Sequence, residues 1–129
     1  MDPIDVNILV IDDVQSVRIQ LEELLKSFGF RRVTAAASVP EARLAMEKEA
    51  FQLILCDWHM VPITGLEFVR HVRQQAALKD IPFIMVTAES TKERVIEAIQ
   101  AGIDDYIVKP LTLGHMNKVY KILLKKQGA

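Results

Sequence analysis

Four short apolar runs in this chain each end at a polar side chain that can take part in chemistry. The runs and the polar residues that follow them are 6–11 before Asp12 and Asp13, 51–56 before Asp57, 82–86 before Thr87, and 106–108 before Lys109. Ligands of an open parallel sheet bind outside the carboxyl ends of its strands. The pattern therefore predicts a single site at one edge of such a sheet.

Strand-like and helix-like patterns alternate along the chain, which is typical of repeated βα units around a parallel sheet. The predicted strands are 6–11, 32–36, 52–57, 82–87 and 105–108, and the predicted helices are 14–28, 39–49, 65–76, 91–101 and 112–126. We expect an α/β fold, a doubly wound and flavodoxin-like five-stranded parallel sheet with helices on both faces. The strand order 2-1-3-4-5 puts Asp12 and Asp13 beside Asp57.

Several local patterns support the predicted helices. Three pairs fit capping boxes, in which side chains satisfy free N–H groups at a helix start: Ser38 with Glu41, Thr64 with Glu67, and Ser90 with Glu93. Gly29 and Gly102 stand where glycines commonly end helices. The first helix has a core-facing apolar stripe made of Val14, Val17, Leu21, Leu24, Leu25 and Phe28.

The composition limits the function classes. We expect one domain over residues 1–129, because this length suits a single core. The net charge of -1 and the lack of a long basic run argue against direct nucleic-acid binding. No apolar run approaches ~20 residues, so we expect no membrane insertion. The one cysteine, Cys56, lies in an apolar strand, and the acidic N-terminus lacks a signal-peptide pattern, so we expect a cytoplasmic protein. We expect a monomer, because the last helices lack the charged pairing pattern of dimeric DNA-binding regulators.

The polar groups at the strand ends suit a divalent cation and a phosphoryl group. Each has a plainer interpretation. Asp12 and Asp13 are typical of a helix cap, Thr87 of a helix-entry cap, and Lys109 of a surface lysine before a turn proline. Asp57 at the end of a second inner strand favours a site instead.

These residues, with Pro110 after Lys109 and the segments 57–60, 87–89 and 102–106, resemble the receiver domain of bacterial response regulators. The resemblance covers essentially the whole chain and extends in particular to the single-domain, CheY-like chemotaxis regulators. It implies a phosphorylation-activated switch of a two-component system. Asp57 would accept a phosphoryl group from a sensor histidine kinase or phosphotransfer protein.

The resemblance also implies a role for each neighbouring residue. Mg²⁺ would be held by Asp13 and Asp57 directly, by Asp12 through water, and by the carbonyl group of His59. Lys109 and Thr87 would contact the phosphoryl group, and Lys109 would precede a cis proline. Tyr106 would turn inward when Thr87 moves. The surface of the fourth helix, fifth strand and fifth helix would bind a downstream protein target. Candidates near this surface are Val95, Ile96, Ile99, Tyr106, His115 and Val119.

His59 and Glu89 lie two residues after Asp57 and Thr87, where they would flank an attacking water and tune the rate of dephosphorylation. A histidine beside three acids is also compatible with a transition-metal ligand. Trp58 is expected to be a partly exposed aromatic residue near the metal. The chain departs from the family at residues 60–65, where proline comes one position late although Gly65 keeps its place.

Other functions remain as alternatives. A magnesium-dependent phosphohydrolase with an aspartate nucleophile also places an acid after a buried strand, but it typically needs a second acid where this chain has His59. A flavin or nucleotide module would need a glycine- or hydroxyl-rich phosphate loop, where this chain has Asp12 and Asp13. An excised input domain, a relay receiver and a phosphate sink would share the same chemistry.

Overall fold

The computed structural model describes the backbone of residues 2–128 and side chains up to residue 126. The strands are β1 (Asn7–Ile11), β2 (Arg32–Ala36), β3 (Leu53–Cys56), β4 (Phe83–Thr87) and β5 (Asp105–Val108). The helices are α1 (Gln15–Phe28), α2 (Val39–Lys48), α3 (Gly65–Gln74), α4 (Lys92–Ala101) and α5 (His115–Gly128), with a short 3-10 helix η1 (Pro3–Asp5) before β1. The five predicted strands and five predicted helices are confirmed, with ends that differ by up to three residues; η1 was not predicted.

The five strands form one parallel sheet in the order β2-β1-β3-β4-β5, as predicted. In the register of β1 and β3, Ile11 stands opposite Cys56. The residues that follow these two, Asp12 and Asp57, therefore leave the sheet side by side. The inner strands β1, β3 and β4 are buried along their whole length, because helices cover both of their faces.

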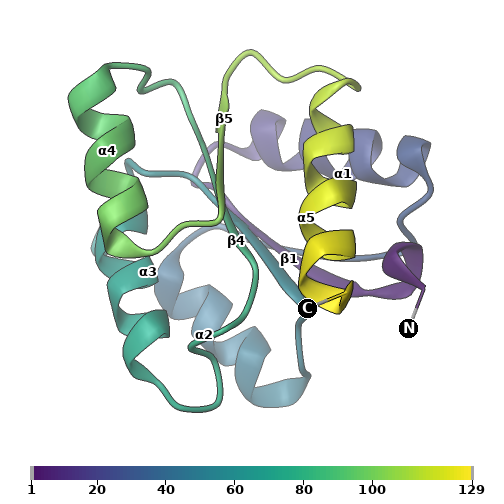
Figure 1. The fold of residues 1–129 in the computed structure, drawn as a ribbon, viewed down its shortest axis with the longest axis horizontal. Helices are drawn as coiled ribbons and strands as arrows, with labels where there is room; N and C mark the ends of the chain where they lie inside the picture. The colour runs from purple at the N-terminus through teal and green to yellow at the C-terminus, as the bar shows by residue number, and fades with distance from the viewer. Residues whose placement is uncertain (1, 129) are drawn as a thin grey trace.

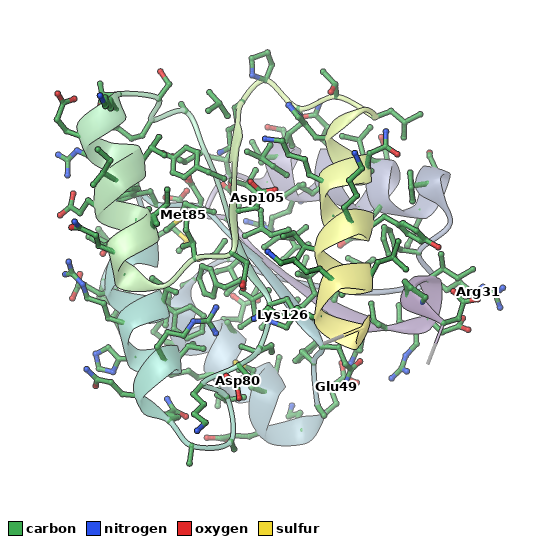
Figure 2. All side chains as sticks on the ribbon, in the orientation of Figure 1. Arg31, Glu49, Asp80, Met85, Asp105 and Lys126 are labelled. Carbon is green, nitrogen blue, oxygen red and sulfur yellow. The ribbon has the colours of Figure 1, made fainter. Side chains whose placement is uncertain are left out.

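Helices α1 and α5 lie on one side of the sheet, and α2, α3 and α4 lie on the other (Figure 1). Side chains fill the space on both sides, with Met85 in the interior and Arg31 at the outer rim (Figure 2). The two apolar layers are separate. One joins Ile8 and Val10 of the sheet to α1 and α5, and the other joins Leu9 and Ile11 to α2, α3 and α4.

Helix ends follow the predicted caps with one exception. Thr64 and Glu67 form a complete capping box at α3. Ser38 caps α2 by accepting a hydrogen bond from the Glu41 N–H group. The predicted cap Ser90 is wrong, because α4 begins one residue later and Thr91 accepts the bond from the Arg94 N–H group. Two adjacent hydroxyl residues offer the same cap chemistry, so the pattern alone does not distinguish them.

The glycines predicted to end α1 and α4 are confirmed. Gly29 and Gly102 have φ angles of 126° and 115°, a region that other residues rarely adopt. The apolar stripe of α1 is confirmed except at its first member. Val14 is 47% exposed because it precedes the helix, whereas Leu21 and Leu25 are buried. None of the helices in the described chain has the length and apolar character needed to span a membrane.

Candidate functional site

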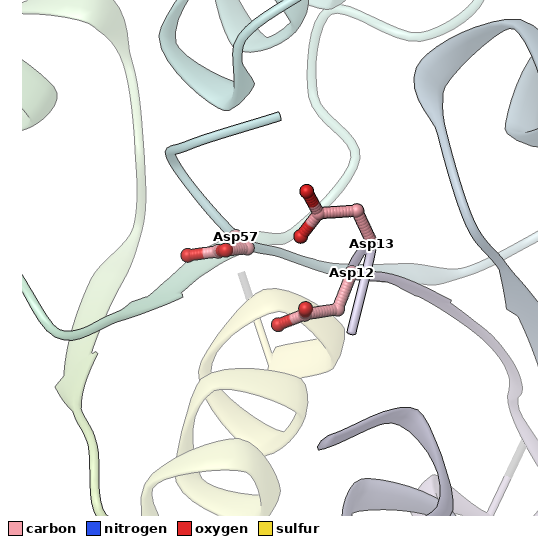
Figure 3. Close-up of side chains that lie close together, drawn as sticks. All are labelled: Asp12, Asp13 and Asp57. Carbon is pink, nitrogen blue, oxygen red and sulfur yellow. The ribbon is translucent and has the colours of Figure 1, made fainter. Parts of the chain in front are cut away.

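The carboxylates of Asp12, Asp13 and Asp57 converge at the carboxyl edge of the sheet (Figure 3). One oxygen from each lies within 4.8 Å of the others. Backbone hydrogen bonds that continue past the strand ends hold this arrangement. The Asp57 N–H group donates to the Ile11 carbonyl over 2.9 Å, and the Asp12 N–H group donates to the Ala36 carbonyl over 3.1 Å. Asp12 and Asp57 are buried, whereas Asp13 is exposed to solvent.

Lys109 points into this acidic cluster. Its Nζ lies 2.9 Å from Oδ2 of Asp12 and 3.7 Å from Oδ2 of Asp57. Its backbone N–H group donates to the Thr87 carbonyl over 3.0 Å, so β4 and β5 remain paired at the site. The Lys109–Pro110 peptide bond is cis, as predicted. The plainer interpretation of Lys109 as a surface lysine is wrong, because its side chain is only 19% exposed and contacts buried acids.

Asp12 also serves the local backbone. Its Oδ1 accepts a hydrogen bond from the Val14 N–H group over 2.9 Å, and its carbonyl accepts one from Arg18 Nη1 over 2.7 Å. The cap interpretation of Asp12 is therefore correct in part. One carboxylate supports the entry to α1 with one oxygen and faces Lys109 with the other.

The carboxyl group of Asp57 lies in a mixed electrostatic environment. Burial raises its pKa, and the nearby charge of Asp12 raises it further. The Lys109 ammonium, the Trp58 backbone N–H group and the Thr87 hydroxyl act in the opposite direction. The net direction is upward, because the loss of hydration of a buried carboxylate outweighs these partners. A cation among the three acids would relieve this cost.

Gly65, at the start of α3, allows the backbone to pass close to Asp57. Its N–H group donates to the Trp58 carbonyl over 2.9 Å. A Cβ atom on Gly65 would lie 2.1 Å from the Asp57 carbonyl oxygen, which is too close for any side chain. The sequence signal was the fixed spacing between Asp57 and a glycine, although the pattern did not reveal which atoms approach each other.

Thr87 and Tyr106 are both buried next to the site. The Glu89 N–H group donates to Oγ1 of Thr87 over 3.4 Å, and the Tyr106 hydroxyl donates to the Glu89 carbonyl over 2.6 Å. Burial, followed by the charges of Glu89 and Asp57, raises the pKa of Tyr106 to about 12, while Arg94 opposes the rise. The Tyr106 ring is therefore turned inward in this structure.

His59 and Glu89, both predicted to tune the rate of dephosphorylation, contact each other. Nε2 of His59 lies 2.8 Å from Oε1 of Glu89, so the β3–α3 and β4–α4 loops meet at the mouth of the site. Among the described residues, the acidic cluster consists of the three aspartates without His59. The imidazole of His59 contacts the Glu89 carboxylate instead. The proposed metal ligand, its carbonyl oxygen, stays a prediction.

The expectation that Trp58 is partly exposed is wrong. The indole is 4% exposed and packs in the core layer with Met60 and Leu66. The guanidinium group of Arg94 covers it, with Cζ 5.5 Å from the ring centroid. No pattern in the sequence indicates this contact, since Arg94 lies on an element predicted only to be a helix.

The predicted output surface carries exposed aliphatic side chains. Ile96 and Ile99 of α4 are 43% and 58% exposed, and Val108 of β5 is 37% exposed. Of the other candidates, Val119 and Tyr106 are buried, and Val95 and His115 are partly buried.

Two clefts of about 640 and 580 Å³ lie elsewhere in the molecule. Both are lined by Phe51, Ala77 and Leu78, and neither contacts the aspartates. The size of a cleft therefore does not mark the polar site in this protein, which is an open cluster of charges at the sheet edge.

Comparison with known proteins agrees with this geometry. The chain is 35% identical to the chemotaxis protein CheY of Pseudomonas aeruginosa over 122 residues, which is 94% of this chain and 98% of that protein. It is also 35% identical to CheY-3 of Vibrio cholerae over 84% of this chain and 83% of that protein.

Solved structures show the same fold. Vibrio cholerae CheY4 matches with a TM-score of 0.83 and 31% identity, covering 92% of this chain and 98% of its own. A putative response regulator from Chloroflexus aurantiacus matches with a TM-score of 0.87 and 30% identity, covering 93% and 98%. Residues 8–121 match the response regulator receiver domain. The three-aspartate cluster, its lysine and these matches agree, and the chain belongs to the response regulator receiver domain family, the signal-receiving part of two-component systems.

Proposed function

We propose that Asp57 accepts a phosphoryl group and that this modification switches the protein between two states. The observation that carries the proposal is the convergence of Asp12, Asp13 and Asp57 within 4.8 Å, with the Lys109 ammonium directed into the cluster. The donor would be a phosphohistidine on a sensor histidine kinase or a phosphotransfer protein.

In the proposed reaction, a carboxylate oxygen of Asp57 attacks phosphorus. An O–P bond forms, the P–N bond to the donor histidine breaks, and the nitrogen leaves with the bonding electron pair. The chain contributes mainly position and charge. The Trp58 N–H group orients Asp57 by donating to its Oδ1 over 2.8 Å, Lys109 offers its ammonium to the phosphoryl oxygens, and Thr87 offers a hydroxyl.

The acidic cluster fits Mg²⁺, which prefers carboxylate and water oxygens. Asp13 and Asp57 would bind it directly, Asp12 through water, and His59 through its carbonyl oxygen. Bound Mg²⁺ would neutralise the repulsion among the carboxylates and attract a phosphoryl oxygen. Because Asp13 is exposed, water can complete the coordination.

Receiver domains are signalling modules rather than enzymes, so the activity proposed for this chain is limited to its own phosphorylation and slow autodephosphorylation. His59 and Glu89 would set the rate of that hydrolysis from the mouth of the site. The output would come through a downstream protein that binds the surface of α4, β5 and α5, where Ile96 and Ile99 are exposed.

Incubation of the protein with Mg²⁺ and acetyl phosphate, followed by intact mass measurement, tests the proposal. We expect one labile phosphoryl adduct, lost in Asp57→Asn and in the presence of a chelator. Asp80→Asn is the matched control, because this exposed carboxylate lies at the opposite edge of the sheet (Figure 2).

The absence of an adduct on the folded protein, with metal and a competent donor present, would refute the proposal. An adduct that persists in Asp57→Asn would move the acceptor elsewhere. Rapid multiple turnover of small phosphate esters would instead favour the aspartate-nucleophile phosphohydrolase.

A further inference from the structure

Arg94 forms a contact between α4 and the loop that carries the site. Its Cζ lies 5.5 Å from the centroid of the Trp58 ring, within the range of a cation–π interaction. The Trp58 ring is buried, whereas the Arg94 side chain is 48% exposed. The guanidinium group therefore separates the indole from solvent at the edge of the core.

Trp58 in turn orients the proposed phosphoryl acceptor. Its backbone N–H group donates to Oδ1 of Asp57 over 2.8 Å, and its carbonyl accepts a bond from Gly65 at the start of α3 over 2.9 Å. A displacement of Trp58 would change the direction of the Asp57 carboxylate. Only one residue thus lies between Arg94 and the reactive group.

Arg94 also belongs to α4, the helix that carries the exposed residues Ile96 and Ile99 of the proposed output surface. Its backbone N–H group is held by the cap residue Thr91, and its Nη1 lies 3.1 Å from Oε1 of Glu97, on the next turn of α4. Arg94 also acts electrostatically on Tyr106. Rotation or displacement of α4 would therefore move the guanidinium group relative to Trp58.

We propose that Arg94 is a positioning residue that couples α4 to the orientation of Asp57 through Trp58. The proposal rests on the proposed function of Asp57 as phosphoryl acceptor. It implies that a protein bound to α4 changes the rate at which Asp57 is phosphorylated. At equilibrium, that protein stabilises the phosphorylated state by the same coupling free energy by which phosphorylation strengthens its binding to α4.

Three variants separate this role from general packing. Arg94→Ala removes the cation from Trp58, and Arg94→Lys restores a positive charge without the planar guanidinium group. Glu97→Ala is the matched control, because it removes the other partner of Arg94 on the same helix and leaves the contact with Trp58. Circular dichroism and the thermal midpoint verify that each variant folds.

Two measurements follow on each variant. Acrylamide quenching of Trp58 fluorescence, the single tryptophan of the chain, reports exposure of the indole without phosphorylation. The rate of adduct formation, measured against acetyl phosphate concentration with Mg²⁺, reports the reactivity of Asp57 toward the phosphoryl donor. We expect Arg94→Ala to increase quenching and to lower the maximal rate by about two- to fivefold, the range for an exposed cation–π contact. The concentration for half-maximal rate should not change, Arg94→Lys should recover part of the rate, and Glu97→Ala should match the wild type.

The outcomes distinguish this coupling from the proposed function. A wild type that forms no adduct refutes the function of Asp57 and, with it, this role of Arg94. A normal wild-type adduct, with Arg94→Ala unchanged in rate, refutes the coupling alone. An equal loss of rate in Glu97→Ala, or a slower Arg94→Ala with unchanged quenching, also refutes it, because the effect would then not pass through Trp58.

Discussion

At the scale of single residues, the site places charge where folding disfavours it. Burial raises the pKa of Asp57, and Asp12 adds to the effect. A carboxyl group whose folded pKa lies above its ordinary value binds more protons in the folded state. The stability of the fold therefore falls as pH rises through the window between the ordinary and the raised pKa.

This sign leads to a prediction for Asp57→Asn. Without metal at neutral pH, the variant should unfold at a higher temperature than the wild type, because the buried charge is removed. Lys109 keeps its closer partner Asp12, at 2.9 Å. Thermal unfolding by circular dichroism in a chelating buffer provides the measurement, and the difference should shrink when the pH falls through the window. A variant that is less stable at every pH would show that the ion pair with Lys109 outweighs the burial cost.

The contact between His59 and Glu89 leads to a second prediction. In His59→Asn, the shorter side chain cannot keep the 2.8 Å contact, so water reaches the phosphoryl group more freely. We expect loss of the adduct to accelerate about two- to tenfold, which corresponds to one hydrogen bond of ~0.5–1.5 kcal/mol. Phosphorylation should proceed as before. The decay of the adduct by mass after removal of the donor is the readout, and an unaltered decay rate contradicts the prediction.

How far the sequence predicts the site depends on the type of contact. The sequence correctly predicts which residues lie together at the site, because the carboxyl ends of parallel strands meet at one edge of the sheet. These residues are Asp12, Asp13, Asp57, Thr87 and Lys109. The cover of Trp58 by Arg94 and the contact of His59 with Glu89 were not predicted. The first contact joins a loop to helix α4 and the second joins two loops, so both depend on loop conformations that no periodic pattern encodes.

At the scale of elements, the start of α3 depends on Gly65, which has no side chain. The Thr64 capping box starts the helix, and Gly65 brings its first turn against the Asp57 carbonyl. The predicted box at Thr64 is confirmed, because Thr64 is the one hydroxyl residue at this helix start and Glu67 follows three residues later. At α4, where Ser90 and Thr91 offer the same chemistry, the boundary moved by one residue.

Gly65→Ala tests this close approach. The added methyl group would lie 2.1 Å from the Asp57 carbonyl oxygen. This oxygen belongs to the backbone, so it cannot move away as a flexible side chain could. We expect a loss of stability of about 1–3 kcal/mol, typical of overpacking, together with slower adduct formation. Chemical denaturation and intact mass measure the two effects.

Gly114→Ala is the control for the element-scale prediction. Its added methyl group would meet only Oγ1 of Thr112, at 3.6 Å, which is ordinary van der Waals contact. This variant should retain both stability and phosphorylation. A Gly65→Ala protein that equals Gly114→Ala in both measurements would mean that the turn shifts without strain.

At the scale of the whole molecule, the edge of the sheet opposite the site is held by a polar network. Arg73 of α3 donates to the carbonyls of Gly102, Lys79 and Ile81 over 2.8, 3.1 and 2.6 Å. Its Nη2 also pairs with Oδ2 of Asp104 at 3.0 Å.

Asp104 extends the network to the sheet and to the last helix. Its Oδ2 accepts a bond from the Phe83 N–H group over 2.8 Å, and Lys126 of α5 lies 3.1 Å from its Oδ1. One network therefore joins α3, the start of β4, the turn after α4, and α5. The end of α4 near Gly102 is anchored, so motion linked to the site is expected mainly at its other end, near Arg94.

Arg73→Met tests whether this network stabilises the fold without taking part in the chemistry. The substitution keeps an unbranched apolar stem but leaves three carbonyls without this donor, and Asp104 keeps only Lys126 and the Phe83 N–H group. We expect a loss of about 2–4 kcal/mol, because several partly buried acceptors lose a charged donor at once and Asp104 loses one of its two cations. Arg70→Met, on the exposed face of the same helix, should change stability by less than about 0.5 kcal/mol. Denaturant unfolding measures both.

Phosphorylation of the folded fraction of Arg73→Met should proceed at the wild-type rate, because the network and the aspartates lie at opposite edges of the sheet. A variant that folds stably but accepts the phosphoryl group slowly would show instead that the two edges are coupled through the sheet.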